Sequence, residues 1–386
     1  WNRQQVGGKQ MKAWVLHGVN DIRFEEVDRP HPADNEVIVA VKAAGICGSD
    51  IPRIYQTGAH VHPLIPGHEF SGQVVALGKN VNEKWLGKRV GIFPLIPCTS
   101  CVQCQKQHYE LCRNYSYLGS RRDGGFAEFV AVPEWNLIAL PDNVTYEQAA
   151  MMEPMAVAVH AMRSAIPEDT DRSKSIAVYG LGTIGMLLVM FLKEAGFSNI
   201  YALGNKDFQR EMAAEIGVEE QDIDPNSSCL LQSKLFCFGV EEQDIDLNKK
   251  MKELKREWLM VKTKGAGVDV FFECVGKNET IVDAVRCTAP NGTVQLVGNP
   301  ASDIHFEKNT YWKILRDQLT VKGSWNSSFT HNTEDDWHYV LDRLARGAVS
   351  PQRCITHSLA LDELEKGFLM MRDKTQPYMK VMQKSS

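Results

Sequence analysis

The stretch Ser175-Ile-Ala-Val-Tyr179-Gly180-Leu-Gly-Thr-Ile-Gly185 decides the fold of this chain. Its first five residues have strand character, and an apolar, helix-like segment follows the glycines as far as Ala195. A GxGxxG pattern between a strand and a helix is typical of a turn that binds the pyrophosphate of a dinucleotide. The glycines permit a tight turn, close approach of the phosphates and helix-on-sheet packing. Without that context the pattern would be a plain glycine turn. The residues expected against a cofactor are Gly180, Leu181, Gly182, Thr183, Ile184 and Gly185.

The segments that follow repeat the same alternation of strand and helix. Residues 268–272 and 293–297 are predicted as later strands of the same sheet. Such βαβ units, joined by right-handed crossovers, predict a Rossmann-type doubly wound parallel sheet in an α/β protein. We expect this dinucleotide-binding domain to span residues 161–298.

The chain before this domain has a different pattern. Between residues 11 and 136, short β-rich runs such as 36–42 and 72–77 are separated by glycine and proline turns. We expect a β-rich domain over 11–160, a return of the chain to it over 299–386, and a natural start at Met11, with residues 1–10 extraneous. An eight-residue segment, 217–224, recurs as 239–246 and is interpreted as a tandem duplication inserted in the nucleotide domain. Two copies are too few for a solenoid.

Composition excludes several classes of function. The 386 residues are 44% hydrophobic and 24% charged, and their net charge of −5 offers no basic surface for nucleic acid. No apolar stretch reaches the ~18 residues of a membrane span, and the first thirty residues lack a signal-peptide core. The cysteines outside the cluster described next show no pairing pattern, which suits a reducing compartment. We therefore expect a cytoplasmic enzyme that acts on a small molecule, without nucleic acid or membrane partners.

A cluster of four cysteines predicts a metal site. Cys98, Cys101, Cys104 and Cys112 have the spacing C-x2-C-x2-C-x7-C, which brings four thiolates together within one loop. Four sulfur ligands suit one tetrahedral zinc ion and leave no position for a substrate. The alternative is four ordinary surface cysteines, which would be an oxidation liability without a metal. The site is thus predicted to be a structural zinc.

A second zinc site is assembled from separated pieces. Cys47, His68 and Glu153 lie in the segments Gly45-Ile-Cys47-Gly-Ser-Asp50, Pro66-Gly-His68-Glu69 and Met152-Glu153-Pro154. A thiolate, an imidazole and a carboxylate bind zinc with one position left open for water or substrate. Taken singly, a lone cysteine is more often a small buried apolar residue, and a Gly-His-Glu segment is more often a turn.

These pieces together resemble the zinc-dependent medium-chain dehydrogenases over essentially the whole chain from Met11. The resemblance also rests on Asp123-Gly-Gly-Phe-Ala-Glu-Phe129 and Glu153-Pro-Met-Ala-Val-Ala-Val-His160. The Glu153-Pro154 pair fits the polyol branch. Further motifs resemble dehydrogenases of galactitol 1-phosphate: Ile51-Pro-Arg-Ile-Tyr55, Gly58-Ala-His60, Gly119-Ser-Arg-Arg-Asp-Gly-Gly125 and Ile314-Leu-Arg-Asp-Gln-Leu-Thr-Val-Lys-Gly-Ser-Trp325.

The resemblance implies a GroES-like catalytic domain, two zinc ions per chain and a homodimer or homotetramer. It places Cys47, His68, Glu69 and Glu153 around the catalytic zinc, and gives Ser49 the role of passing on the alcohol proton. Many relatives carry a histidine five residues after the ligand cysteine, whereas Pro52 stands here. Glu153, water or His60 would have to replace that histidine.

The cofactor preference is expected to be set after the second strand of the sheet, at residues 200–203. NAD-dependent relatives have an acidic residue next, which binds the ribose hydroxyls. This chain has Gly204, followed by Asn205 and Lys206, with Arg210 one helical turn further. We expect NADP(H) to be favoured, with NAD(H) as the alternative because Asp207 is close enough to act as a displaced acid.

The resulting hypothesis is hydride transfer between a polyol phosphate and a nicotinamide cofactor, with Arg53, Arg121 or Arg122 as phosphate partners. The alternative enzyme is a sorbitol-type or vicinal-diol dehydrogenase acting on a non-phosphorylated polyol. A third hypothesis is an inactive nucleotide-binding relic that keeps only the structural zinc.

Overall fold

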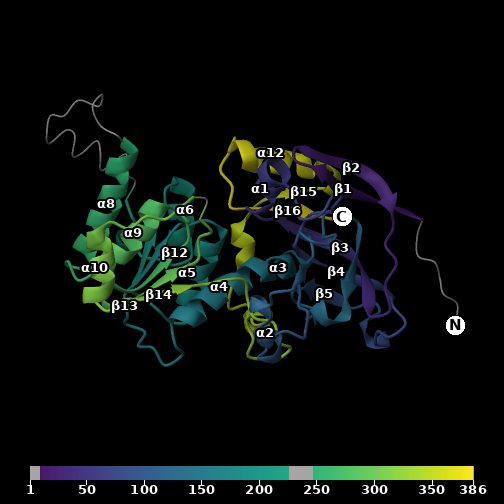
Figure 1. Cartoon of the computed structure of the whole chain (residues 1–386), viewed down its shortest axis with the longest axis horizontal. Helices are drawn as coiled ribbons and strands as arrows, with labels where there is room; N and C mark the ends of the chain where they lie inside the picture. Colours follow the sequence, from purple (N-terminus) through teal and green to yellow (C-terminus); the bar gives the residue numbers. More distant parts are fainter. Residues whose placement is uncertain (1–8, 226–246, 301, 386) are drawn as a thin grey trace. The chain divides into compact units, whose positions relative to one another are not determined.

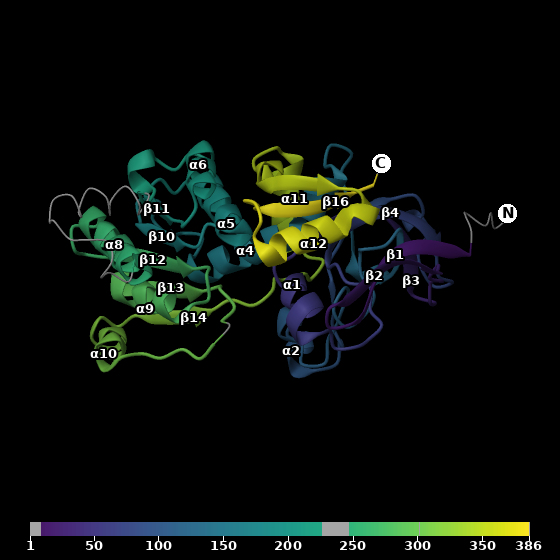
Figure 2. The same ribbon diagram turned by 90° about the horizontal axis from the view of Figure 1, so that it is seen from above.

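The computed structural model describes residues 9–225, 247–300 and 302–385. They form two compact units, one from Trp1–Ala156 and Ser327–Ser386 and the other from Val157–Asn326. Figures 1 and 2 trace the chain through both units. The second unit extends beyond the boundary at residue 298 expected from the sequence, because the strand at Thr320–Gly323 joins its sheet.

The second unit is built on a five-stranded parallel sheet in the order β11-β10-β12-β13-β14. Its strands are β10 (Ile176–Tyr179), β11 (Ile200–Leu203), β12 (Val268–Glu273), β13 (Thr288–Leu296) and β14 (Thr320–Gly323). All residues of β10 and β11 are buried, as expected for parallel strands covered on both faces. Its helices are α5 (Thr183–Glu194), α6 (Asp207–Glu215), α8 (Leu247–Lys262), α9 (Asn278–Cys287) and α10 (Lys308–Arg316). The predicted Rossmann-type sheet is confirmed.

The first unit is β-rich, as predicted. Its main sheet has the order β15-β16-β3-β4-β5-β9, and β8 also pairs with β3. These strands are β3 (Glu36–Ile46), β4 (Glu69–Leu77), β5 (Arg89–Ile92), β8 (Phe129–Pro133), β9 (Leu137–Ala139), β15 (Ile355–Leu359) and β16 (Lys380–Lys384). The strand β16 pairs antiparallel with β3, so residues near the C-terminus belong to the same sheet as residues near the N-terminus.

Smaller elements complete the first unit. Two pairs of strands lie outside the main sheet: β1 (Gln10–Gly18) with β2 (Asp21–Asp28), and β6 (Leu95–Ile96) with β7 (Ser116–Tyr117). The helices are α1 (Asp50–Pro52), α2 (Val102–Gln105), α3 (Tyr146–Ala150), α11 (Asp336–Ala345) and α12 (Leu364–Asp373), while α4 (Met152–Ala165) connects the two units along the chain. A buried cluster that includes Trp14, Phe70, Phe126 and Phe368 forms the core.

The first copy of the duplicated segment belongs to the second unit. Its Ile223 forms a parallel bridge with Ala202 of β11, and Asp224 follows it into the interior. The second copy, 239–246, lies outside the described residues. No helix of the described chain is long and apolar enough to cross a membrane.

Candidate active site

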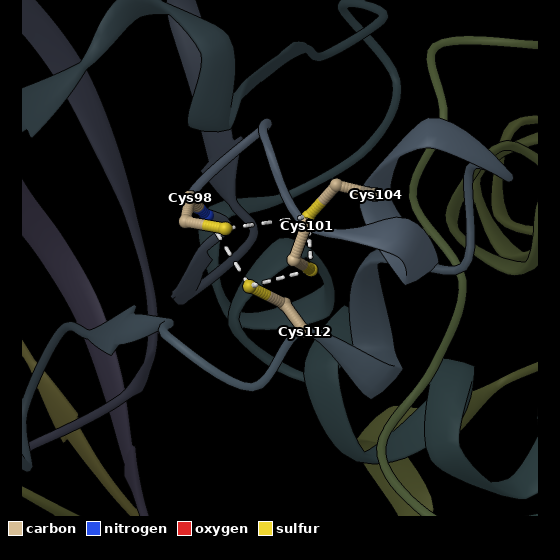
Figure 3. Close-up of side chains that lie close together, drawn as sticks. All are labelled: Cys98, Cys101, Cys104 and Cys112. Atoms are coloured by element: carbon tan, nitrogen blue, oxygen red, sulfur yellow. Dashed lines mark hydrogen bonds between the residues drawn. The ribbon is translucent and has the colours of Figure 1, made fainter.

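The four cysteines of the cluster converge as predicted (Figure 3). The Sγ–Sγ distances are 3.9 Å for Cys98–Cys104, 3.5 Å for Cys101–Cys104 and 4.0 Å for Cys101–Cys112. A tetrahedron with Zn–S bonds of about 2.3 Å has edges of about 3.8 Å, whereas a disulfide bond is about 2.05 Å long. The four thiols therefore have the separation of zinc ligands, and all four are free cysteines.

Backbone N–H groups prepare part of this cluster for a cation. Hydrogen bonds from the backbone and side chain of Ser100 lower the pKa of Cys98 to about 6, and the backbone of Cys104 lowers the pKa of Cys101. Burial raises the pKa of Cys104 to about 12 and also raises that of Cys112. Cys98 and Cys101 thus lose their protons more readily than an ordinary cysteine, and a bound metal ion would be needed to deprotonate all four.

A second group of metal-ligating side chains is formed by Cys47, His68 and Glu69. One ligand atom from each lies within 4.8 Å of the others. Cys47 directly follows β3, whereas Glu69 is the first residue of β4, and the antiparallel register places Gly45 opposite Glu69. Strand pairing thus assembles a mixed S, N and O donor set that fits zinc.

A glycine loop fixes the turn before His68. Gly67 has a φ of +96°, which favours glycine, and its carbonyl accepts a hydrogen bond of 2.8 Å from the N–H of Gly125. The Asp123 side chain accepts a further bond, of 2.9 Å, from the N–H of Ile65. The Asp123-Gly-Gly125 motif therefore fixes the backbone that leads into His68.

Asp50 supports the histidine ring. Its Oδ1 lies 3.5 Å from Nδ1 of His68, which is long for a hydrogen bond, and this buried nitrogen has no hydrogen-bond partner among the described residues. Burial alone would lower the pKa of His68, but Asp50 and Cys47 outweigh burial and raise it well above its usual value. With Nδ1 turned to Asp50, Nε2 is the nitrogen that would bind a metal, in the carboxylate–histidine–metal arrangement of many metal sites.

Glu69 is bound by a lysine that the sequence reasoning missed. Lys380 Nζ donates to both carboxylate oxygens, at 2.8 and 2.6 Å, and to the carbonyl of Ile46 at 3.3 Å. Burial would lower the pKa of Lys380, but Glu69 outweighs it and raises the pKa. A Cβ at Gly45 would lie 2.2 Å from Glu69 Oε2, so glycine is required there to leave room for the carboxylate.

Glu153 lies near this group but is not one of its three converging members. Its Oε1 accepts a hydrogen bond of 3.2 Å from the Tyr117 hydroxyl. Burial raises the pKa of Glu153 to about 7, with a further contribution from Glu69, against the opposing effect of His68. The structure therefore places Glu153 within electrostatic reach of His68 and Glu69, outside the group of three that converges, and adds Tyr117, which the sequence reasoning missed.

Ser49 also lies at this group. It is exposed, and its hydroxyl donates a hydrogen bond of 3.3 Å to Cys47 Sγ. Pro52 ends the short helix α1, and His60 is exposed on the following segment. A side chain at the surface beside a ligand sulfur is suitably placed to meet an incoming substrate.

Basic side chains cluster beside the same segment. Burial, followed by the charges of Arg121 and Arg53, lowers the pKa of His60, so these three groups lie within electrostatic range. Arg53 is also paired with Asp50, and the Arg121 guanidinium lies 4.6 Å from the ring centre of Tyr115. Arg122 is paired with Glu36, so its charge is already matched by a carboxylate.

In the second unit, each glycine of the turn has the geometry that cofactor binding requires. Gly180 has a φ of +105°. Gly182 precedes α5, and a Cβ built there would meet no atom within 4 Å. A Cβ at Gly185 would lie 2.0 Å from the carbonyl oxygen of Gly180. The turn thus combines backbone freedom, open space at the helix N-terminus and tight packing, as dinucleotide-binding turns do.

The predicted specificity residues follow β11, above a buried ion pair that the sequence reasoning missed. The N–H of Gly204 donates to Asp224 at 2.7 Å, and Lys255 Nζ bonds both Asp224 and the carbonyl of Gly204. Burial raises the pKa of Asp224 and lowers that of Lys255, and each charge partly offsets the shift of the other. An acid therefore does lie under residue 204, but it is matched by a lysine and bound to backbone.

The other residues of this turn are Asn205, Lys206 and Arg210. Asn205 is exposed, and Lys206 Nζ lies 5.7 Å from the ring centre of Phe208. Arg210, which we expected to face a cofactor phosphate, is paired with Asp207. Asp207 is thus engaged by a cation of its own helix.

Comparison with known proteins agrees with this arrangement. Residues 33–142 match the model of the alcohol dehydrogenase GroES-like domain, and residues 183–346 match that of zinc-binding dehydrogenases. Galactitol 1-phosphate 5-dehydrogenase of Escherichia coli strain K12 is 33% identical over 324 residues, which cover 84% of this chain and 85% of that protein. (R,R)-butanediol dehydrogenase of Bacillus subtilis strain 168 is 31% identical over 381 residues, which cover 95% of this chain and 98% of that protein.

A solved structure extends the likeness to the coordinates. A zinc-binding dehydrogenase from Sinorhizobium meliloti 1021, bound to NADP, has a TM-score of 0.80 and 27% identity, and the match covers 98% of this chain and 100% of that one. The family matches, the two-unit fold and the converging donor sets agree with one another. The chain therefore belongs to the zinc-dependent medium-chain dehydrogenase family, and is a zinc-binding alcohol or polyol dehydrogenase.

Proposed function

We propose that the protein transfers hydride between a secondary alcohol of a polyol phosphate and a nicotinamide cofactor. The observation that carries this proposal is the convergence of Cys47, His68 and Glu69 within 4.8 Å, with Ser49 exposed beside them. These three residues would hold a catalytic zinc, and Cys98, Cys101, Cys104 and Cys112 a structural one. When bound, the catalytic zinc would stabilise the alkoxide form of the alcohol as a Lewis acid.

Other residues of the chain would transfer the proton and bind the cofactor. Ser49 accepts the proton of the alcohol oxygen and passes it outward, because its hydroxyl is both exposed and bonded to the ligand sulfur. Glu153 lies close enough to influence the charge of the site, and its pKa near 7 suits a group that exchanges protons at neutral pH. The Gly180–Gly185 turn would bind the cofactor pyrophosphate.

Metal analysis tests the two-zinc arrangement. We expect two zinc ions per chain in the wild-type protein and one after Cys47→Ser. A wild-type protein with one zinc ion would contradict the enzyme hypothesis and favour a relic with only the structural metal.

A phosphorylated polyol is proposed as the substrate, with galactitol 1-phosphate as the first candidate. The proposal is supported by the relative that acts on this compound and by the basic cluster of His60, Arg53 and Arg121. The guanidinium groups of Arg53 and Arg121 are donors of the kind that recognise phosphate oxygens. The butanediol relative favours a non-phosphorylated diol as the second candidate.

A substrate panel separates these candidates. Catalytic efficiency would be measured by cofactor absorbance on galactitol, galactitol 1-phosphate, sorbitol, xylitol and 2,3-butanediol. We expect the phosphate ester to be preferred, and Arg121→Gln to reduce that preference without reducing activity on galactitol. Equal efficiency on galactitol and its phosphate would refute a role for the phosphate.

NADP(H) is proposed as the favoured cofactor. Gly204 provides no carboxylate to bind the ribose hydroxyls or to repel a 2′-phosphate, and the buried Asp224 is matched by Lys255. The NADP bound to the Sinorhizobium relative also supports the proposal. We expect better kinetics with NADP, and a shift toward NAD in Gly204→Asp.

Gly204→Ala is the matched control for that substitution. A Cβ at residue 204 would lie 2.9 Å from Leu181 Cδ1, so either variant must displace this flexible side-chain end. Only the aspartate adds charge, so only it should change the preference. A wild-type protein at least tenfold better with NAD would overturn the proposal.

A homodimer is also proposed. All four residues of β14 are exposed and, in the described chain, β14 pairs only with β13. Large apolar side chains are exposed on the preceding helix α10, on β14 and just after it: Tyr311, Trp312, Leu315, Val321 and Trp325. An unpaired edge with apolar neighbours is suited to pairing with a second copy. Light scattering should give twice the chain mass, and Val321→Lys should reduce the measured mass.

A cytoplasmic location is proposed as well. The free thiols of the described cysteines support it, because a reducing compartment keeps thiols unpaired.

A further inference from the structure

Tyr117 lies on a short strand that follows the cysteine cluster in sequence, and its side chain reaches Glu153. It is the second residue of β7, which pairs with β6, and these two strands flank the cysteine cluster in sequence. Its carbonyl accepts hydrogen bonds from the N–H groups of Arg121, at 2.9 Å, and Arg122, at 3.1 Å. The backbone of Tyr117 is therefore fixed on both sides.

The side chain of Tyr117 contacts one proposed zinc ligand, His68, and the neighbouring Glu153. Its hydroxyl donates to Glu153 Oε1 at 3.2 Å, and its ring lies edge-on to the His68 ring at a centroid distance of 5.9 Å. Glu153 is 7% exposed, so its carboxylate cannot exchange this donor freely for water. The phenol is the hydrogen-bond donor to Glu153 in the described chain, and a bound metal ion would offer a second partner.

The geometry distinguishes Glu153 from the other carboxylate. Glu69 is one of three residues whose ligand atoms converge within 4.8 Å, and Glu153 is not. Three protein ligands leave a fourth position for substrate in a tetrahedral zinc site, whereas a fourth protein ligand would close it. Whatever holds Glu153 aside thus determines whether an alcohol can bind.

We propose that Tyr117 is a positioning residue that holds Glu153 away from the catalytic zinc and so keeps the substrate position open. This inference rests on the proposed function, because it assumes a zinc ion held by Cys47, His68 and Glu69. Without the phenol, Glu153 would gain most by ligating the metal, since a buried carboxylate without a partner is unfavourable.

Tyr117→Phe tests the proposal, with Tyr115→Phe as the matched control. Tyr115 lies two residues earlier and packs against the Tyr117 ring at 6.2 Å, and no contact with the ligands is found for it in the described chain. The readout is the rate at which a chromogenic chelator removes the catalytic zinc, identified as the phase that is absent in Cys47→Ser. We expect about tenfold slower release in Tyr117→Phe, as estimated from the loss of one hydrogen bond to a charged group, and wild-type release in Tyr115→Phe.

Kinetics and a second variant make the test specific. KM for the alcohol should rise and kcat fall in Tyr117→Phe, while KM for the cofactor stays unchanged. In a Glu153→Gln background, Tyr117→Phe should no longer slow zinc release, because the amide is a poor zinc ligand. Wild-type release in Tyr117→Phe would overturn the proposal, and so would an equal slowing with and without Glu153.

These outcomes are separable from failure of the proposed function. If zinc release responds as expected but no polyol is oxidised, the function fails and the role of Tyr117 at the metal remains. If polyols are oxidised and zinc release is unchanged, the role of Tyr117 alone fails.

Discussion

Replacing Lys380 by methionine tests the buried ion pair of Lys380 with Glu69 in the first unit. The lysine and Glu69 form two hydrogen bonds, at 2.8 and 2.6 Å, and their side chains are 4% and 1% exposed. In the metal-free protein, methionine keeps much of the length and apolar stem of lysine but leaves the Glu69 carboxylate buried without a cation. Removing one partner of a buried ion pair costs about 3–5 kcal/mol, and we expect a loss of stability in this range.

Urea unfolding would measure the loss, with Glu69→Gln and the double variant completing a cycle. Because the double variant removes both charges of this pair, it should recover more than half of the loss. Lys366→Met is the control, since Lys366 pairs with Glu363 at the surface and its removal should leave the unfolding midpoint unchanged.

The pH dependence adds a check with a definite sign. The pKa of Lys380 is raised above its ordinary value of 10.5, so its stabilisation is fully present below that value and is lost only as pH rises through the folded pKa. The destabilisation of Lys380→Met should therefore be equal at pH 7 and pH 9. A loss below about 0.5 kcal/mol, or strict additivity in the double variant, would refute the reasoning.

Three further predictions concern the metals, the proton and the second unit. Cys101→Ser should lose one zinc and destabilise or dissociate the protein, whereas Cys47→Ser should keep the fold and abolish turnover; metal analysis and activity decide, and a Cys47 variant with wild-type turnover would contradict the assignment. Ser49→Ala should keep zinc and cofactor binding but lower turnover ~100-fold, measured across pH; normal turnover would remove Ser49 from the mechanism. Asp269→Asn should destabilise the protein by about 1 kcal/mol at pH 7, because this partly exposed carboxylate accepts bonds from Ser175 N at 2.8 Å and Oγ at 2.7 Å. Burial would raise the pKa of Asp269, but hydrogen bonds from Lys174 and Ser175 outweigh it and lower the pKa. The stabilisation is therefore present above the ordinary value of 3.8 and is lost as pH falls through the folded pKa. If Asp269→Asn and the wild type still differed in urea unfolding at low pH, the carboxylate would not be the source of the stabilisation.

The sequence predicted what local patterns encode. The glycine turn after β10 and the four-cysteine cluster each lie within one short segment, and spacing alone indicates their geometry. Cys47 and His68 lie in separate segments of the sequence. Only the resemblance to a known family indicated that they belong to one site. The predictions of a Rossmann-type parallel sheet and of a β-rich unit both depended on short-range patterns, and both are confirmed.

The contacts that were missed join residues far apart in sequence. Lys380 is 311 residues from Glu69, and Lys255 is 51 residues from Gly204, so no periodicity relates the partners. Tyr117 was indistinguishable from any other aromatic residue of a short strand until the β6–β7 pairing placed it beside Glu153. The boundary at residue 298 was placed too early because β14 is an exposed strand, without the continuous apolar run that identified its neighbours.

The pairing of Glu69 with Lys380 has a consequence for how the protein is made. At roughly 5–20 residues per second, a ribosome adds Lys380 about 15–60 s after Glu69. All of the second unit, Val157–Asn326, is synthesised within that interval from one continuous segment. We therefore expect the second unit to fold first on the ribosome, although it comes second in the chain. The first unit would wait with an unmatched carboxylate until its last strand emerges, and chains released before Lys380 should be recognised by quality control as incomplete.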